Sequence, residues 1–170
     1  VPTPKASAGK VRIKVGAAGV CLSDVHFLDG TLKPGYLQGD EVTLGHEVAG
    51  TIDEIGSGVT KFKVGDRVLV IAGERNEHNQ ITTLGFDYDG GYAEFVIAKE
   101  SLLVKIPENL PFEQAAIIPD AVSTPWAAIS STAKIQSGES VAVFGVGGLG
   151  IHAVQLLNCL LYTSDAADEG

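Results

Sequence analysis

Short apolar runs dominate the first two thirds of the chain. The first run alternates apolar and polar positions, and the others are bounded by Gly, Asp or Pro, which is typical of β-strands. The predicted strands are residues 11–15, 48–55, 68–72, 92–98 and 102–106. We therefore expect this part of the chain to be β-rich.

Helical signals are fewer and shorter in this region. One helix is predicted at residues 23–28, ahead of Gly30, and a second at residues 111–118, where a proline occupies the first turn. A third helix is predicted to begin at Thr124. The sequence therefore favours strands joined by a few short helices.

The pattern changes after residue 137. An apolar run at residues 141–144 is followed by a glycine-rich loop at residues 145–150 and a helix-compatible segment at residues 151–160. A strand, a glycine loop and a helix in this order open a βαβ unit. The fold class is thus α+β, and residues 162–170, which show no apolar period, are predicted to be a non-native or disordered tail.

The composition excludes several classes of function. The 12 Lys and Arg residues are outnumbered by 21 Asp and Glu residues, which gives a formal net charge of −9 and argues against a nucleic-acid surface or an anionic membrane partner. Apolar stretches such as residues 151–161 are shorter than the roughly 18–20 residues that cross a bilayer. Two cysteines in a chain of this length fit a reducing compartment, so we expect a cytoplasmic protein. The sequence lacks Met, and we expect it to be incomplete at its N-terminus.

A thiol, a hydroxyl, a carboxylate and an imidazole fall within six residues, at Cys21, Ser23, Asp24 and His26. The tripeptide Gly45-His46-Glu47 lies further along the chain. Thiolate and imidazole are preferred zinc ligands, and a catalytic zinc has three protein ligands and one open position. Taken singly, a cysteine can equally be a small buried apolar residue and a histidine an ordinary core residue.

The combination of motifs closely resembles the zinc-dependent alcohol dehydrogenases of the medium-chain dehydrogenase/reductase superfamily. The motifs are Gly19-Val20-Cys21, Ser23-Asp24, His26, Gly45-His46-Glu47 with Gly50, and Gly65-Asp66-Arg67-Val68. The resemblance implies a GroES-like catalytic domain at residues 1–124, incomplete at its N-terminus. It also implies the start of a truncated Rossmann domain at residues 125–161, before the predicted tail at 162–170.

The resemblance also implies a ligand set for one catalytic zinc. Cys21 and His46 match two ligands, and Asp120 is assigned as the third, where many relatives have cysteine. Carboxylate oxygen is an acceptable zinc donor, although an aspartate beside a proline can instead form a turn or a helix cap. Residues 71–92 contain no cysteine, so a structural zinc is not expected there.

The remaining polar residues of these motifs match the family's auxiliary groups. Asp24 is expected to orient the histidine ligand, and Glu47 to approach the zinc when its ligands change. Ser23 would contact the substrate oxygen, and His26 would pass its proton to solvent. Asp24 and Glu47 could instead be solvated acids, Ser23 a helix cap and His26 an exposed imidazole.

The glycine loop follows a predicted strand and precedes a helix, as in dinucleotide-binding folds. It is expected to bind the pyrophosphate of NAD or NADP through Gly145, Gly147, Gly148, Leu149 and Gly150. Thr124 matches a threonine beside the nicotinamide. A tight turn without a ligand, and a helix cap at Thr124, are the alternatives.

These residues predict an NAD(P)-dependent alcohol dehydrogenase acting on a primary, secondary or alicyclic alcohol or its carbonyl product. The full-length parent is expected to be a homo-oligomer, and this chain alone to be inactive. Two alternatives are a metal-free GroES-like module and a zinc-independent quinone or enoyl reductase of the same superfamily. Neither alternative explains why Cys21, His46 and Asp120 occur together.

Overall fold

A computed structural model describes residues 2–37 and 40–162 of the chain. The chain forms two compact units, Val1–Pro119 and Asp120–Gly170, which are described separately below. The unit boundary lies a few residues before the predicted domain boundary at 124/125, and the domain assignment stays a prediction. Most of the predicted tail, residues 163–170, lies outside the described residues.

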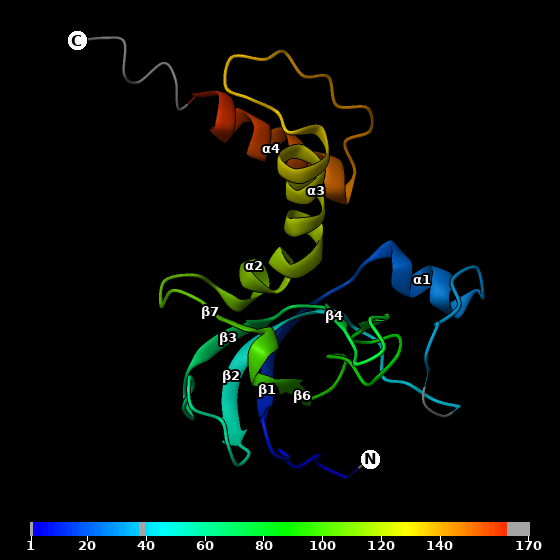
Figure 1. Ribbon diagram of the computed structural model, residues 1–170, viewed down its shortest axis with the longest axis vertical. Helices are drawn as coiled ribbons and strands as arrows, with labels where there is room; N and C mark the ends of the chain where they lie inside the picture. Colours follow the sequence, from blue (N-terminus) through cyan, green and yellow to red (C-terminus); the bar gives the residue numbers. More distant parts are fainter. Residues whose placement is uncertain (1, 38–39, 163–170) are drawn as a thin grey trace. The chain divides into compact units, whose positions relative to one another are not determined.

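The first unit is built on a curved antiparallel sheet of five strands (Figure 1). The strand order is β6-β1-β2-β3-β7. The bounds are β1 Lys10–Gly19, β2 Glu47–Ile55, β3 Arg67–Val70, β6 Phe95–Lys99 and β7 Leu103–Lys105, with a short helix, η1 Glu100–Leu102, between the last two. All five predicted strands are therefore present, although the segments predicted at residues 92–98 and 102–106 are shorter than expected.

The sheet buries apolar side chains on both of its faces. One face forms the larger core, which contains Val11, Ile13, Val48, Ile52 and Val68. On the other face, helix α2 (Phe112–Ala116) packs its alanines against Ala49 and Leu69. Because α2 covers the second face, four successive residues at the start of β2 are buried, whereas a one-sided strand would alternate.

The segment between β7 and α2 is held by the side chain of Arg67, at the start of β3. Its guanidinium donates to the backbone carbonyls of Pro107, Glu108 and Leu110. The same group lies 4.4 Å from the ring centroid of Phe112, in a cation–π contact. Arg67 of the Gly-Asp-Arg-Val motif therefore has a structural role in this fold.

The pairing of β1 with β2 brings two distant motifs to the same edge of the sheet. Gly19, the last residue of β1, is the register partner of Glu47, the first residue of β2. Helix α1 (Leu22–Leu28) begins just after β1, and His46 lies just before β2. The residue at the start of α1 and the residue before β2 are consequently neighbours.

Residues 73–78 form part of a hairpin that the hydrophobic pattern does not predict. Strand β4 (Gly73–Arg75) pairs with β5 (Ile81–Thr83). The side chain of Asn76 closes the turn by accepting from the backbone amides of His78 and Gln80. The pattern misses this hairpin because polar turn contacts fix it and its residues show no apolar alternation.

The regular elements described in the second unit are helices, and residues 134–147 between them have no regular structure. Its elements are the π-helix η2 Ile118–Val122, α3 Ser123–Ala127, the π-helix η3 Ala128–Ala133 and α4 Gly148–Tyr162. The predicted helix after the glycine loop is present as α4. Residues 141–144 form no strand, because no other described segment pairs with them and a strand needs a hydrogen-bonding partner.

Among the described residues, no helix is both long and apolar enough to span a bilayer. The longest of the described helices, α4, has 15 residues.

Gly50 offers a test of the close packing between β1 and β2. A Cβ atom at this position would lie 2.2 Å from the carbonyl oxygen of Lys14 and 2.8 Å from Cγ2 of Ile13. We expect Gly50→Ala to lower the free energy of unfolding by about 2 kcal/mol, because the backbone must shift to admit the methyl group. Chemical denaturation followed by circular dichroism measures this change.

The matched control is Gly35→Ala, where an added Cβ would meet no atom within 4 Å. This variant should stay within about 0.5 kcal/mol of the wild type. Equal stability of the two variants would contradict the assigned packing.

Candidate metal centre

Cys21 is fixed at the start of α1 by a reciprocal capping arrangement. Its sulfur accepts from the backbone amide of Ser23 at 3.5 Å, while its own amide donates to Oδ2 of Asp24 at 3.0 Å. This is the geometry of a capping box, with sulfur in the position usually held by a hydroxyl oxygen. The backbone of the helix that Cys21 caps therefore fixes the orientation of its thiol.

Two further predicted residues lie on the same short helix. Ser23 is half-buried, and its Oγ lies 3.5 Å from the sulfur of Cys21. The His26 side chain is 44% exposed, and its Nδ1 lies 3.5 Å from Oδ2 of Asp29. Residues three apart share one helix face, so Ser23 and His26 are neighbours on a path that leads toward solvent.

His46 follows a loop that is held by a second, glycine-rich segment. The backbone amide of Gly90 donates to the carbonyl of residue 43 at 2.7 Å. The amide of Gly91 donates to the carbonyl of residue 45 at 2.8 Å, and that of Tyr92 to the carbonyl of residue 44 at 2.9 Å. Gly45 has φ of +98°, and a Cβ there would lie 2.6 Å from the ring of Tyr92. The loop before His46 therefore requires glycine both for its backbone conformation and for space.

The imidazole of His46 is 4% exposed. Its ring centroid lies 4.9 Å from that of Phe86, which in turn stacks against Phe27 on α1. Nδ1 lies 3.5 Å from Oδ1 of Asp24. These neighbours restrict the ring orientation, so that Nδ1 faces Asp24.

Asp24 connects the two predicted ligand residues through one carboxylate. It is 3% exposed. Oδ2 accepts from the amide of Cys21 at 3.0 Å and from the hydroxyl of Tyr92 at 2.8 Å, while Oδ1 faces His46. The buried carboxylate thus has two firm hydrogen bonds on one oxygen and the imidazole beside the other.

Tyr92 is a site residue that the sequence reasoning missed. Its hydroxyl lies 2.8 Å from Oδ2 of Asp24 and 2.9 Å from the carbonyl oxygen of Gly19. Burial, followed by the hydrogen bond to Asp24 and the nearby negative charges, raises the pKa of this phenol. The available signal was Gly90-Gly91 directly before an aromatic residue, since paired glycines often indicate a close backbone approach.

Glu47 lies at the same edge of the sheet and is 3% exposed. Its carboxylate fills the space above Gly19, where an added Cβ would lie 2.0 Å from Oε2. The glycine of the Gly-Val-Cys motif is therefore required to make room for a buried acid. Glu47 is also among the charges that raise the pKa of Tyr92.

Asp120 lies in the π-helix η2, where its Oδ1 accepts from the hydroxyl of Thr124 at 2.6 Å. Thr124, predicted to lie beside a nicotinamide, is thus also the residue that orients this carboxylate. Cys21 and His46 belong to the first unit, and Asp120 is the first residue of the second. A thiol, an imidazole and a carboxylate are donor types that a tetrahedral metal ion accepts.

The glycine loop has the local geometry expected of a dinucleotide fingerprint. Gly145 has φ of +88°, and a Cβ at Gly150 would lie 1.9 Å from the carbonyl oxygen of Gly145. Around Gly147 and Gly148 an added Cβ would meet no atom within 4 Å, while Leu149 is exposed. The loop is thus tight where it turns and open where a pyrophosphate would approach.

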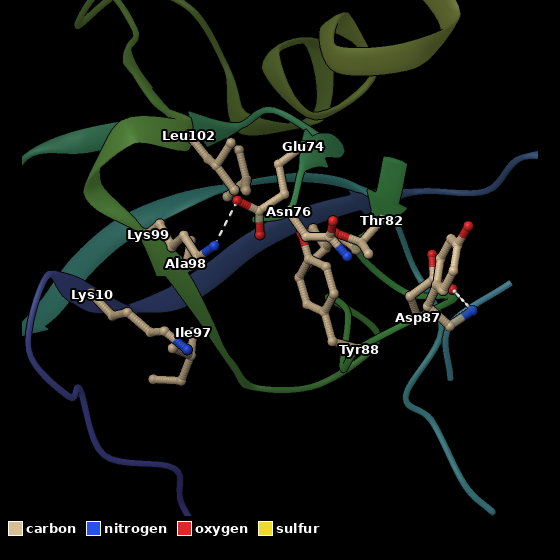
Figure 2. A pocket seen from close by; sticks show the side chains of 13 residues that line it. Lys10, Glu74, Asn76, Thr82, Asp87, Tyr88, Ile97, Ala98, Lys99 and Leu102 are labelled. Carbon is tan, nitrogen blue, oxygen red and sulfur yellow. Dashed lines mark hydrogen bonds and ion pairs between the residues drawn. The ribbon is translucent and has the colours of Figure 1, made fainter. Parts of the chain in front are cut away.

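A pocket of about 300 Å³ lies beside the β4–β5 hairpin (Figure 2). Glu74 and Lys99 form an ion pair of 2.8 Å at its wall, and Tyr88 and Asp87 also line it. The described residues that line this pocket include none of the predicted site residues. The pocket is therefore separate from the candidate metal centre.

A curved β-sheet whose edge presents a half-buried thiol beside a buried imidazole and a buried acid belongs to the class of GroES-like catalytic domains. The sequence profile of the alcohol dehydrogenase GroES-like domain matches residues 7–108. The chain belongs to this family, the zinc-dependent alcohol dehydrogenases of the medium-chain dehydrogenase/reductase superfamily.

Individual relatives agree with this assignment. An alcohol dehydrogenase of Geobacillus stearothermophilus is 38% identical over 100% of this chain and 53% of its own length. A crystal structure of an NAD-dependent alcohol dehydrogenase has a TM-score of 0.86 at 29% identity, over 94% of this chain and 50% of the other. A cobalt- and zinc-bound alcohol dehydrogenase of Pyrobaculum aerophilum has a TM-score of 0.83 at 31% identity, over 94% and 51%. The chain thus spans about half the length of these relatives.

Asp24 provides a stability test of the centre. In Asp24→Ala the amide of Cys21 loses its acceptor, and the hydroxyl of Tyr92 keeps only the carbonyl of Gly19. Leaving a buried donor unsatisfied costs about 1–3 kcal/mol. We expect a loss of this size in urea denaturation with a chelator present, so that only the hydrogen bonds are measured.

Asp53→Ala is the matched control, because Asp53 pairs with Arg12 at the exposed surface. Exposed ion pairs contribute at most about 1 kcal/mol. An equal loss in both variants would argue against a special role of the buried carboxylate.

Proposed function

We propose that the chain is the catalytic part of a zinc-dependent, NAD(P)-linked alcohol dehydrogenase. The single observation that carries the proposal is the register of β1 and β2, which brings the thiol of Cys21 and the imidazole of His46 to one edge of the sheet, both beside the carboxylate of Asp24. Asp120 is proposed as the third ligand, and the three residues together offer donor types that zinc accepts. The names of the relatives support a reaction between an alcohol and a carbonyl compound.

The donor set fits one catalytic zinc held by three protein ligands. When bound, zinc supplies Lewis acidity to a substrate oxygen, and the nicotinamide cofactor accepts or donates the hydride. Asp24 would hold the imidazole of His46 in one tautomer, since Nδ1 faces its carboxylate at 3.5 Å. The hydroxyl of Thr124 would hold the carboxylate of Asp120 in the same way.

Ser23 and His26 would move the hydroxyl proton of the substrate. The Oγ of Ser23 lies beside the sulfur of Cys21, so a substrate oxygen near the centre would be within its reach. His26 is partly exposed and can exchange protons with water. Glu47, buried beside Gly19, is proposed as the auxiliary carboxylate near the zinc.

The glycine loop is proposed to bind the cofactor's pyrophosphate. Gly147 and Gly148 leave open space at the start of α4, and a helix N-terminus favours negative charge. Gly145 and Gly150 would keep the loop in its tight conformation. We further propose a primary, secondary or alicyclic alcohol as substrate, either NAD or NADP as cofactor, and a homo-oligomeric parent protein.

Zinc content tests the proposal directly. We expect about one zinc per chain by elemental analysis of protein purified without chelator, in keeping with a single three-ligand site. Cys21→Ser should remove it, because oxygen is a poorer zinc donor than thiolate and the remaining two ligands hold the ion weakly.

Cys159→Ser is the matched control, since Cys159 is exposed on α4 and should not affect the zinc content. Wild-type protein without zinc would favour the metal-free alternative, and a loss caused by Cys159→Ser would contradict the assigned ligand set. A zinc-independent reductase would likewise leave Cys21 and His46 without a function.

The isolated chain should show no turnover. It spans about half the length of relatives that carry alcohol dehydrogenase names, so we expect it to lack part of the cofactor site. The measurement is NADH or NADPH formation from a panel of primary, secondary and alicyclic alcohols. Turnover above that of the Cys21→Ser variant would contradict this expectation.

A further inference from the structure

We infer that Tyr92 is a positioning residue for the metal centre and that it acts through the carboxylate of Asp24. The inference rests on the proposed zinc site and adds a residue beyond the ligands and their immediate partner. It is carried by the hydrogen bonds around Oδ2 of Asp24, all of which lie within the first unit.

Rotation of the Asp24 carboxylate would change its contact with His46. Oδ2 is fixed by two donors from different directions, the amide of Cys21 at 3.0 Å and the hydroxyl of Tyr92 at 2.8 Å. With Oδ2 held in this way, Oδ1 remains 3.5 Å from Nδ1 of His46. The amide of Cys21 fixes only one direction, so removal of the phenol hydroxyl would free the carboxylate to turn.

The hydroxyl of Tyr92 has two acceptors and only one proton. The carbonyl of Gly19 lies at 2.9 Å and the carboxylate of Asp24 at 2.8 Å. Hydrogen bonds to a charged acceptor are stronger than those to a neutral one. The proton therefore goes to Asp24 while that residue is ionised, and the Gly19 carbonyl fixes the position of the hydroxyl at the end of β1.

Tyr92 also connects the two loops that present the ligands. Its backbone amide donates to Leu44, and its ring fills the space beside Gly45, next to His46. Its hydroxyl reaches Gly19 and Asp24, on either side of Cys21. One side chain thus fixes the spacing between the segment before His46 and the segment around Cys21.

The test compares Tyr92→Phe with Tyr88→Phe in the 170-residue chain. Tyr88 is a matched control because its buried hydroxyl has no hydrogen-bond partner among the described residues. We expect Tyr92→Phe to bind zinc about tenfold more weakly in competition with a chromophoric chelator, the loss typical of outer-shell partners. Its cobalt(II) form should show a changed thiolate-to-metal absorption band, and Tyr88→Phe should match the wild type in both.

A double-mutant cycle shows whether Tyr92 acts through Asp24. In an Asp24→Asn background, Tyr92→Phe should cause little further loss of zinc affinity, because the acceptor is already altered. Equal zinc affinity of Tyr92→Phe and wild type, or an undiminished loss in the Asp24→Asn background, would overturn the inference. The cycle also distinguishes this role from a general loss of folding. A folding defect in Tyr92→Phe would lower the zinc affinity in the Asp24→Asn background as well.

The zinc content of the wild type and of Cys21→Ser tests the proposed function independently of Tyr92. If wild-type protein binds zinc and Cys21→Ser does not, the metal site stands whatever Tyr92→Phe shows. If wild-type protein binds no zinc, the proposed function and the role of Tyr92 are both overturned.

Discussion

The antiparallel pairing of β1 with β2 is the constraint on which the centre depends. The register joins Gly19 to Glu47, so the residues just beyond these strand ends must be neighbours. Cys21 follows the end of β1 and His46 precedes β2, which explains how residues far apart in sequence share one edge of the sheet. The buried apolar residues of β1 and β2 hold that register, because a slip by one position would turn Val11 and Ile13 to the other face.

Much of the sheet was predictable because its strands carry a strong local signal. Runs such as residues 48–55 and 68–72 are apolar and bounded, and they became β2 and β3. The β4–β5 hairpin was not predictable in this way, since the side chain of Asn76 and short backbone pairing define it. Residues 141–144 show the reverse case, in which an apolar pattern is present and no described segment supplies a pairing partner.

The sequence predicted which residues form the candidate site. It did not predict the hydrogen bonds that join them. Motif spacing pointed to Cys21, His46 and Asp120, and the structure brings the first two to one edge of the sheet through the register of β1 and β2. Tyr92 could not be found by the same route, because its contribution depends on a hydroxyl reaching an acid on a distant helix. The contact of Thr124 with Asp120 was also missed, because the helix was predicted to begin at Thr124 and the helical segment in fact includes Asp120.

The loop before His46 is surrounded by glycines from another part of the chain. Added Cβ atoms at Gly85 and Gly90 would lie 2.8 and 2.3 Å from the backbone of Gly45. Two main-chain segments here are in direct van der Waals contact, with no side chain between them that evolution could enlarge or trim. Sequence variation in this scaffold is therefore restricted at these glycines, where any added side chain meets backbone, and is freer where the contacts between segments are made by side chains.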